Sequence, residues 1–278
     1  LVGSEMCIRD RSYIDIDKDG VISLNHLEET LKNNSRTFVS IMHANNEIGT
    51  IQPLKDIGEI CNKYDAIFHS DTVQTMGHFN FDMQDINVHF MAASAHKFHG
   101  PKGIGFIYIS EDITINPMIR GGEQERNMRA GTENVLGIAA LSMAMDIAYH
   151  NMDQDTRYIK QIKSYMIERL TSEIPDVGFF GKSADIDDSL YTVLSVHFPE
   201  TSFDEMLLFN LDIMGIACSG GSACASGGNK GSHDFSAIMP DSKRRGIRFS
   251  FSKYTTKEDI DYTIEKLKEL YSSPDSNT

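Results

Sequence analysis

The sequence predicts an α/β fold whose large domain contains a mostly parallel sheet, followed by a smaller α+β domain. Between residues 36 and 110, short apolar and β-branched runs alternate with a segment of helical periodicity at 54–64. Strand–helix–strand order is typical of βαβ units with parallel strands. Beyond residue 153 a strand-like run, "DDSLYTVLSVHF", and two further helical segments predict the second domain.

The first elements predicted are a tight hairpin and a helix. Residues 1–12 show neither helical nor strand periodicity, and we expect an assembly artefact or a disordered end. "DIDKDGVISLNH", residues 15–26, has the acids and the glycine that open an EF-hand loop, but its twelfth position is His26 instead of glutamate. We therefore favour a strand, an Asp-Gly turn, a short "VIS" strand and the helix "LNHLEETLKNN" over calcium binding.

Four strands are predicted next: "RTFVSIMH", "AIFHSD", "INVHFMAASAHK" and "GIGFIYIS". A helix is expected over 133–170, broken near "HNMDQD", which predicts a hinge between domains at 13–152 and 153–278. In the second domain "FDEMLLFNLD" predicts a helix, and a mobile glycine-rich loop is expected at about 219–239. The last helix begins with a capping signal formed by Thr256 and Asp259.

Composition excludes several classes of function. The 278 residues have a net charge of −14, which disfavours binding to nucleic acid or to an anionic membrane. No apolar run approaches the length of a membrane-spanning helix. The cysteines, Cys7, Cys61, Cys218 and Cys224, are too few and too scattered for a disulfide framework or a zinc site. A reducing cytoplasm is the expected location.

Polar residues follow three of the predicted strands, at the edge of the sheet where α/β proteins bind ligands. These residues are Asn45, Asn46, Asp71, Gln74, Ser94, His96 and Lys97. A lysine in a partly apolar site has its charged form disfavoured and can form a Schiff base. An aspartate two strands away suits the pyridinium nitrogen of pyridoxal 5'-phosphate (PLP), and Ser94 and His96 can donate to a phosphate. A solvated lysine at a strand end is the simpler alternative for Lys97 alone.

Five motifs in register, "HANNEIGTIQP", "HSDTVQTMG", "SAHKFHGPKGIGF", "GGEQERNMRAGTEN" and "SGGSACASG", resemble the cysteine desulfurases of the NifS/IscS type. These belong to the class V aminotransferase group of PLP-dependent fold-type I enzymes. The resemblance runs from about residue 13 to 271. It implies a cytoplasmic homodimer that takes sulfur from L-cysteine and passes it to an acceptor such as an iron–sulfur scaffold, for iron–sulfur cluster assembly or tRNA thiolation.

The resemblance also implies a role for each site residue. Lys97 would form the Schiff base with PLP, and the other cofactor contacts would be Asn46, Asp71, Gln74, Ser94, His96 and Thr132. Asp71 would face the ring nitrogen, Gln74 and Asn46 the ring oxygen, and Ser94 and His96 the phosphate. Thr132 would reach the phosphate of the partner subunit. Arg248 would bind the substrate carboxylate through its guanidinium fork.

Cys224 would be the second catalytic residue, receiving the sulfur as a persulfide. Only the thiolate attacks, so we expect a lowered pKa for this thiol in the closed state. No resident metal is expected, although Cys224 is also a candidate transient ligand of an iron–sulfur cluster. Cys218 ends the apolar run "LDIMGIAC" and is the rival nucleophile, but a packed core residue is favoured there, as at Cys61.

The chain departs from the family pattern at its N-terminal side. The resemblance covers about the last two thirds of a family member, without the "TSGATESNN"-like phosphate turn and the ring-stacking histidine. An inactive truncated fragment is therefore one alternative. A selenocysteine lyase or another class V PLP enzyme remains a second, because such enzymes can share a site.

Overall fold

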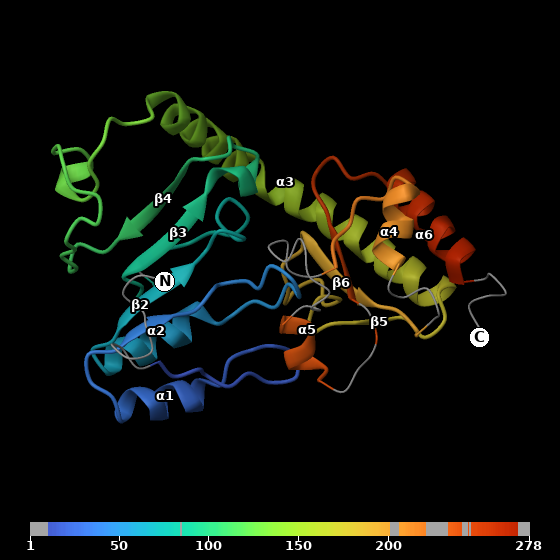
Figure 1. Cartoon of the computed structure of the whole chain (residues 1–278), viewed down its shortest axis with the longest axis horizontal. Helices are drawn as coiled ribbons and strands as arrows, with labels where there is room; N and C mark the ends of the chain where they lie inside the picture. The colour runs from blue at the N-terminus through green and yellow to red at the C-terminus, as the bar shows by residue number, and fades with distance from the viewer. Residues whose placement is uncertain are drawn as a thin grey trace.

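The computed structural model describes residues 11–83, 85–200, 206–220, 233–240, 244 and 246–271. Within them a four-stranded sheet and a three-stranded sheet lie at opposite ends of the molecule, and one long helix runs along both (Figure 1). Each sheet has its own apolar core. The α/β class predicted from the sequence is confirmed.

The first sheet has the order β1-β2-β3-β4, formed by β1 (Phe38–Ser40), β2 (Ile67–Asp71), β3 (Phe90–Ser94) and β4 (Gly105–Ile109). β1, β2 and β3 are parallel, as predicted, whereas β4 runs antiparallel to β3. The reason is the short connection, residues 95–104, which holds only the single-turn helix η1 (Ala95–Phe98). A parallel crossover needs a dozen or more residues.

Two helices cover this sheet through one apolar face each. α1 (Leu24–Lys32) begins at Ser23, whose hydroxyl accepts a bond from the His26 amide. α2 (Leu54–Lys63) buries Leu54, Ile57 and Cys61 against the strands. Burying such faces is the main favourable term in folding.

The hairpin predicted before α1 is present. Ile16 and Ile22 form an antiparallel bridge, and the Asp17 carboxylate accepts the amides of Asp19 and Val21 within the turn. This carboxylate therefore stabilises the turn by accepting main-chain hydrogen bonds within it.

α3 (Val135–Glu173) corrects one prediction, because it continues without a break through residues 150–155. The polar run "HNMDQD" suggested an interruption, but these residues mark the point where the helix passes from one core to the other. Leu141, Met145 and Tyr149 pack against the core of the first sheet, and Ile162 and Met166 lie in the core of the second. In Figure 1 the same helix spans both ends of the molecule.

The second sheet is antiparallel, with the order β5-β6-β7, formed by β5 (Gly178–Phe179), β6 (Val193–His197) and β7 (Gly246–Ser250). α4 (Leu207–Ile213) and α6 (Lys257–Tyr271) complete its core, together with the C-terminal half of α3. α6 begins with the predicted capping box: the Thr256 hydroxyl accepts the Asp259 amide, and Asp259 accepts the Thr256 amide.

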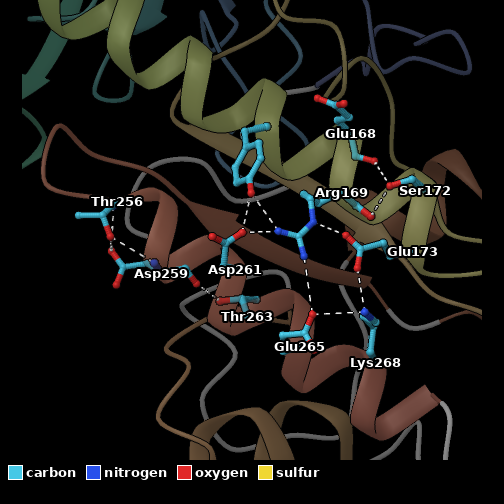
Figure 2. Close-up of polar contacts among 11 residues, drawn as sticks. Glu168, Arg169, Ser172, Glu173, Thr256, Asp259, Asp261, Thr263, Glu265 and Lys268 are labelled. Carbon is cyan, nitrogen blue, oxygen red and sulfur yellow. Dashed lines mark hydrogen bonds and ion pairs between the residues drawn. The ribbon is translucent and has the colours of Figure 1, made fainter.

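α6 is also held to α3 by a network of charged side chains (Figure 2). Arg169 of α3 contacts Glu173, Asp261 and Glu265, and Lys268 of α6 bonds Glu173 at 2.9 Å. Every cation in this network therefore has at least one carboxylate partner.

The predicted loop at 219–239 is described only near its ends. Ser219 forms a backbone bridge with Arg248, and residues near the other end form α5 (His233–Ile238), a short helix that the sequence analysis did not predict. The ring of Phe235 stacks on Phe180 with a centroid separation of 4.1 Å. Cys224 lies outside the described residues. No helix among those described is long and apolar enough to cross a membrane.

Candidate active site

A cavity of about 190 Å³ lies between the two sheets, and predicted site residues from both domains line it. Asn46 follows β1, Gln74 follows β2, and His96 and Lys97 belong to η1 after β3. Arg248 enters from the centre of β7. The structure thus brings together strand-end residues of the first sheet and an arginine about 150 residues further along the chain.

The Lys97 side chain faces this cavity without a hydrogen bond to any described residue. Its pKa lies below the ordinary lysine value of 10.5, chiefly because burial disfavours the charged form and also because the Arg248 charge is close. The negative charge of Asp71 acts in the opposite direction. A larger fraction of Lys97 is therefore the neutral, nucleophilic amine than in a solvated lysine.

Arg248 has hydrogen-bonding capacity left over. One guanidinium nitrogen, Nη1, donates to the Asn46 carbonyl at 2.8 Å, whereas Nε is buried and has no hydrogen-bond partner among the described residues. Burial lowers the Arg248 pKa, and the charge of Glu47 partly offsets this. A buried donor without an acceptor costs free energy, and a ligand that supplies the acceptor removes this cost. The Arg248 side chain therefore suits an anionic ligand.

A second hollow, of about 350 Å³, shares His96 with the first. Ser94 and His96 line it, and their Oγ and Nδ1 atoms are 2.9 Å apart. Lys102 lies on the same wall, a residue that sequence reasoning passed over although it belongs to the quoted motif "GPKGIG". One wall is open because a Cβ at Gly103 would meet nothing within 4 Å. Hydroxyl, imidazole and ammonium groups around such a hollow suit a phosphate.

Two predicted residues lie outside both hollows. Asp71 ends β2, is exposed, and accepts the Val73 amide at 2.9 Å, although its charge still acts on Lys97. Thr132 is exposed in the segment between β4 and α3, which is coloured green in Figure 1 and extends away from the sheet.

The described cysteines are poor nucleophiles. Burial raises the pKa of Cys61 to about 12 and that of Cys218 to about 11. At neutral pH both remain thiols, and the thiolate is the reactive form. Both pack in or against the apolar cores, as predicted.

Sequence reasoning missed the histidine that contacts the main chain of the lysine. His78 Nε2 lies 3.1 Å from the Lys97 carbonyl oxygen, and His78 Nδ1 lies 2.8 Å from the Tyr191 hydroxyl. The signal was present in "HSDTVQTMGH", but nothing in the sequence links that segment to Tyr191. Another histidine, His43, is buried and bonds Thr75 at 2.9 Å, and burial lowers its pKa to about 4.

No group of three or more metal-ligating side chains occurs in the described part of the chain. A model of the family described as Aminotransferase class-V matches residues 10–263. The chain belongs to the class V aminotransferase family. A curated member, the cysteine desulfurase IscS of Dictyoglomus turgidum, is 39% identical over 261 residues, which cover 93% of this chain and 65% of that protein. The putative cysteine desulfurase IscS 1 of Bacillus subtilis is 38% identical over 255 residues.

Solved structures of this class V group agree. The NifS-like protein from Rickettsia africae superposes with a TM-score of 0.83 at 32% identity, covering 94% of this chain and 69% of that one. Another NifS-like protein superposes with a TM-score of 0.81 at 35% identity. The fold is therefore that of the fold-type I PLP enzymes, as the motifs predicted. The chain spans 65% of the length of the Dictyoglomus turgidum protein and 66% of the length of the Bacillus subtilis protein.

Proposed function

We propose that this protein is a cysteine desulfurase, which converts L-cysteine to L-alanine and a persulfide on Cys224 with the help of PLP. One observation supports this most strongly. Lys97 and Arg248 face the same cavity, and neither forms an ion pair with a carboxylate of the described chain. A site with two such cations suits an anionic cofactor and an anionic amino acid.

The residues present fit PLP. Lys97 offers an amine of lowered pKa, and Asn46 and Gln74 offer amides on the same cavity wall. Ser94 and His96 border the second hollow, which suits the phosphate. Asp71 is the proposed partner of the ring nitrogen, and Lys102 is an additional cation for the phosphate. When bound, PLP would withdraw electrons from the bonds at the substrate α-carbon.

Arg248 is proposed to orient the substrate. Its unpartnered Nε points to a missing acceptor, and a carboxylate can take two parallel bonds from a guanidinium group. Because Nη1 is already held by the Asn46 carbonyl, the fork is fixed relative to the first sheet before substrate arrives. Such pre-organisation lowers the entropy lost on binding.

Cys224 is proposed as the nucleophile. The chain enters its segment at Ser219, whose amide and carbonyl both pair with Arg248. The Cys224 thiolate would attack the substrate sulfur, forming an S–S bond as the C–S bond breaks. The electron pair of the broken bond stays with the carbon fragment, which gains a proton and leaves as alanine. The raised pKa values of Cys61 and Cys218 disfavour either of them in this role.

The proposed assembly is a cytoplasmic homodimer in which Thr132 reaches the cofactor phosphate of the other subunit. Exposed apolar side chains between residues 118 and 143 support it. Four of them are at least 62% exposed: Met118, Val135, Leu136 and Met143. Exposed apolar groups that form a contiguous patch are typical of a protein interface. The persulfide would pass to an acceptor protein, for iron–sulfur cluster assembly or tRNA thiolation.

The domain division proposed from sequence, 13–152 and 153–278, has support from packing. Met152 is the first buried residue of α3, and the helix changes core near that point. The substrate cavity lies between the two parts, with Lys97 on one and Arg248 on the other.

Cofactor attachment and sulfur transfer can be tested separately. The chain would be incubated with PLP, reduced with borohydride and mapped by mass spectrometry. We expect the label on Lys97, with attachment abolished in Lys97→Ala and retained in Lys63→Ala, an exposed lysine that bonds Glu28. With L-cysteine, alanine and a persulfide on Cys224 should form. Cys224→Ala should still carry PLP on Lys97 but should form neither alanine nor a protein-bound persulfide. Cys218→Ala should form both products.

A label on a different lysine would refute the role of Lys97. A protein-bound persulfide in Cys224→Ala would refute the choice of nucleophile.

A further inference from the structure

The carbonyl of Lys97 lies where η1 can no longer provide a hydrogen bond. The next amide that could reach it within the helix, that of Gly100, donates instead to the Ala95 carbonyl at 2.8 Å. Pro101, one position later, has no N–H. Carbonyls at the end of a helix need a partner from elsewhere.

His78 supplies that partner. Its Nε2 lies 3.1 Å from the Lys97 carbonyl oxygen. A carbonyl only accepts, so Nε2 must carry the proton and donate it. His78 Nδ1 is then an acceptor, and the Tyr191 hydroxyl, 2.8 Å away, donates to it. The two bonds fix both the tautomer and the plane of the imidazole ring.

Tyr191 ties this arrangement to the second domain. It is 2% exposed and lies two residues before the start of β6, with its ring set edge-on to His78 at a centroid distance of 5.6 Å. Burial lowers the pKa of His78 and raises that of Tyr191 to about 12, so both stay neutral near pH 7. The chain of bonds therefore runs from the second domain through an imidazole to the main chain of Lys97.

We infer that His78, oriented by Tyr191, is a positioning residue that fixes the main chain of Lys97 and so directs its amine into the cavity. The inference rests on the proposed role of Lys97. A side chain whose own backbone can shift would spend part of its time outside the cavity, where neither burial nor Arg248 disfavours its charge. His78 thereby links the placement of the second domain to the reactivity of the lysine.

The test needs no cofactor. Competitive acetylation of the unliganded full chain across pH 7–11, mapped by mass spectrometry, gives the titration midpoint of Lys97, with exposed Lys18 as the internal reference. His78→Asn keeps an amide near Nδ1 but cannot reach the Lys97 carbonyl, whereas His78→Gln places a donor near Nε2. We expect His78→Asn to raise the Lys97 midpoint, with about threefold slower relative labelling near pH 8. His78→Gln should restore the wild-type value.

Tyr191→Phe should raise the midpoint in the same direction by a smaller amount. The matched control is Tyr262→Phe, which removes a hydroxyl of α6 that bonds the Met214 carbonyl at 2.8 Å, away from the cavity. An unchanged midpoint in folded His78→Asn, or an equal shift in Tyr262→Phe, would overturn the inference. If His78→Asn does not fold, the Gln and Tyr191→Phe variants decide. Failure of wild-type Lys97 to take up PLP would instead refute the proposed function and leave this result unaffected.

Discussion

An arginine and a lysine lie close together in two parts of the molecule, and the two pairs are held differently. On the surface between α3 and α6, Arg169 and Lys268 share the carboxylate of Glu173, and Arg169 also contacts Asp261 (Figure 2). In the cavity between the sheets, Arg248 and Lys97 form no ion pair with a described carboxylate. The first pair is neutralised by its neighbours, and the second is not.

The pKa shifts follow this difference. Hydrogen bonds to Glu173 raise the pKa values of Arg169 and Lys268, whereas burial lowers those of Arg248 and Lys97. A cation with a raised pKa already has its preferred partners. A half-buried cation with a lowered pKa gains free energy when an anion arrives. The comparison therefore separates charges that hold two helices together from charges that await a ligand.

Lys163 is a third case, and it shows that burial and a lowered pKa do not by themselves indicate a binding site. It is fully buried on α3, and its pKa falls to about 7 through burial, with the charge of Asp185 acting in the opposite direction. Its Nζ is nevertheless satisfied by the Ser189 hydroxyl at 2.8 Å and the Leu190 carbonyl at 3.2 Å. What distinguishes Lys97 is the combination of a lowered pKa with an amine that bonds no group in the described part of the chain.

Replacing Lys163 with methionine should produce the largest change. In the wild type, Lys163 loses its proton near pH 7 when folded but keeps it to about pH 10.5 when unfolded. The unfolded state therefore binds the extra proton between these values, and the free energy of unfolding should rise with pH there by about 1.4 kcal/mol per unit. Lys163→Met should lack this contribution in urea unfolding at pH 7–9.5.

The control is Lys18→Met, because Lys18 is exposed and its charge does not act on Lys163. It should keep the wild-type pH dependence. The same slope in Lys163→Met as in the wild type would show that this lysine is not neutral when folded, and its contrast with the paired cations would fail.

Arg248→Gln tests the mutual effect of the two cavity cations and should have an intermediate effect. Removing the positive charge takes away one cause of the lowered Lys97 pKa, although burial remains. We expect the Lys97 midpoint in competitive acetylation to rise, with labelling near pH 8 slower by about threefold. Arg244→Gln is the matched control, because Arg244 contacts Asp176 and does not act on Lys97. An unchanged midpoint in Arg248→Gln would mean that the two cations do not interact.

Much of the fold and part of the candidate site could be predicted from the sequence, because the signals for them are local. The strands, the capping box at Thr256 and the polar strand ends follow from periodicity and side-chain chemistry. The direction of β4 could also have been inferred from its short connection. The continuity of α3 could not, since a polar run looks the same whether a helix ends or changes its packing partner. The hydrogen bond between His78 and Tyr191 could not be predicted either, because the two residues are 113 positions apart in the sequence.

Arg169→Met should have the smallest effect, since the network that it breaks lies at the surface, where ion pairs contribute little and salt screens them. We expect the melting temperature to fall by about 2 °C at low salt and by less in 1 M NaCl. The contribution of Glu173 has a definite pH dependence: its pKa falls from the ordinary 4.5 to about 2 in the fold, so its stabilisation is complete above pH 4.5 and is lost as the pH falls to about 2. The difference between variant and wild type should disappear over that interval.

Lys266→Met is a suitable control, because Lys266 bonds only Glu269 on its own helix among the described residues. A difference that persists unchanged at high salt would show that Arg169 acts through packing of its stem against Tyr165, and the α3–α6 pair would no longer represent charges held by carboxylates.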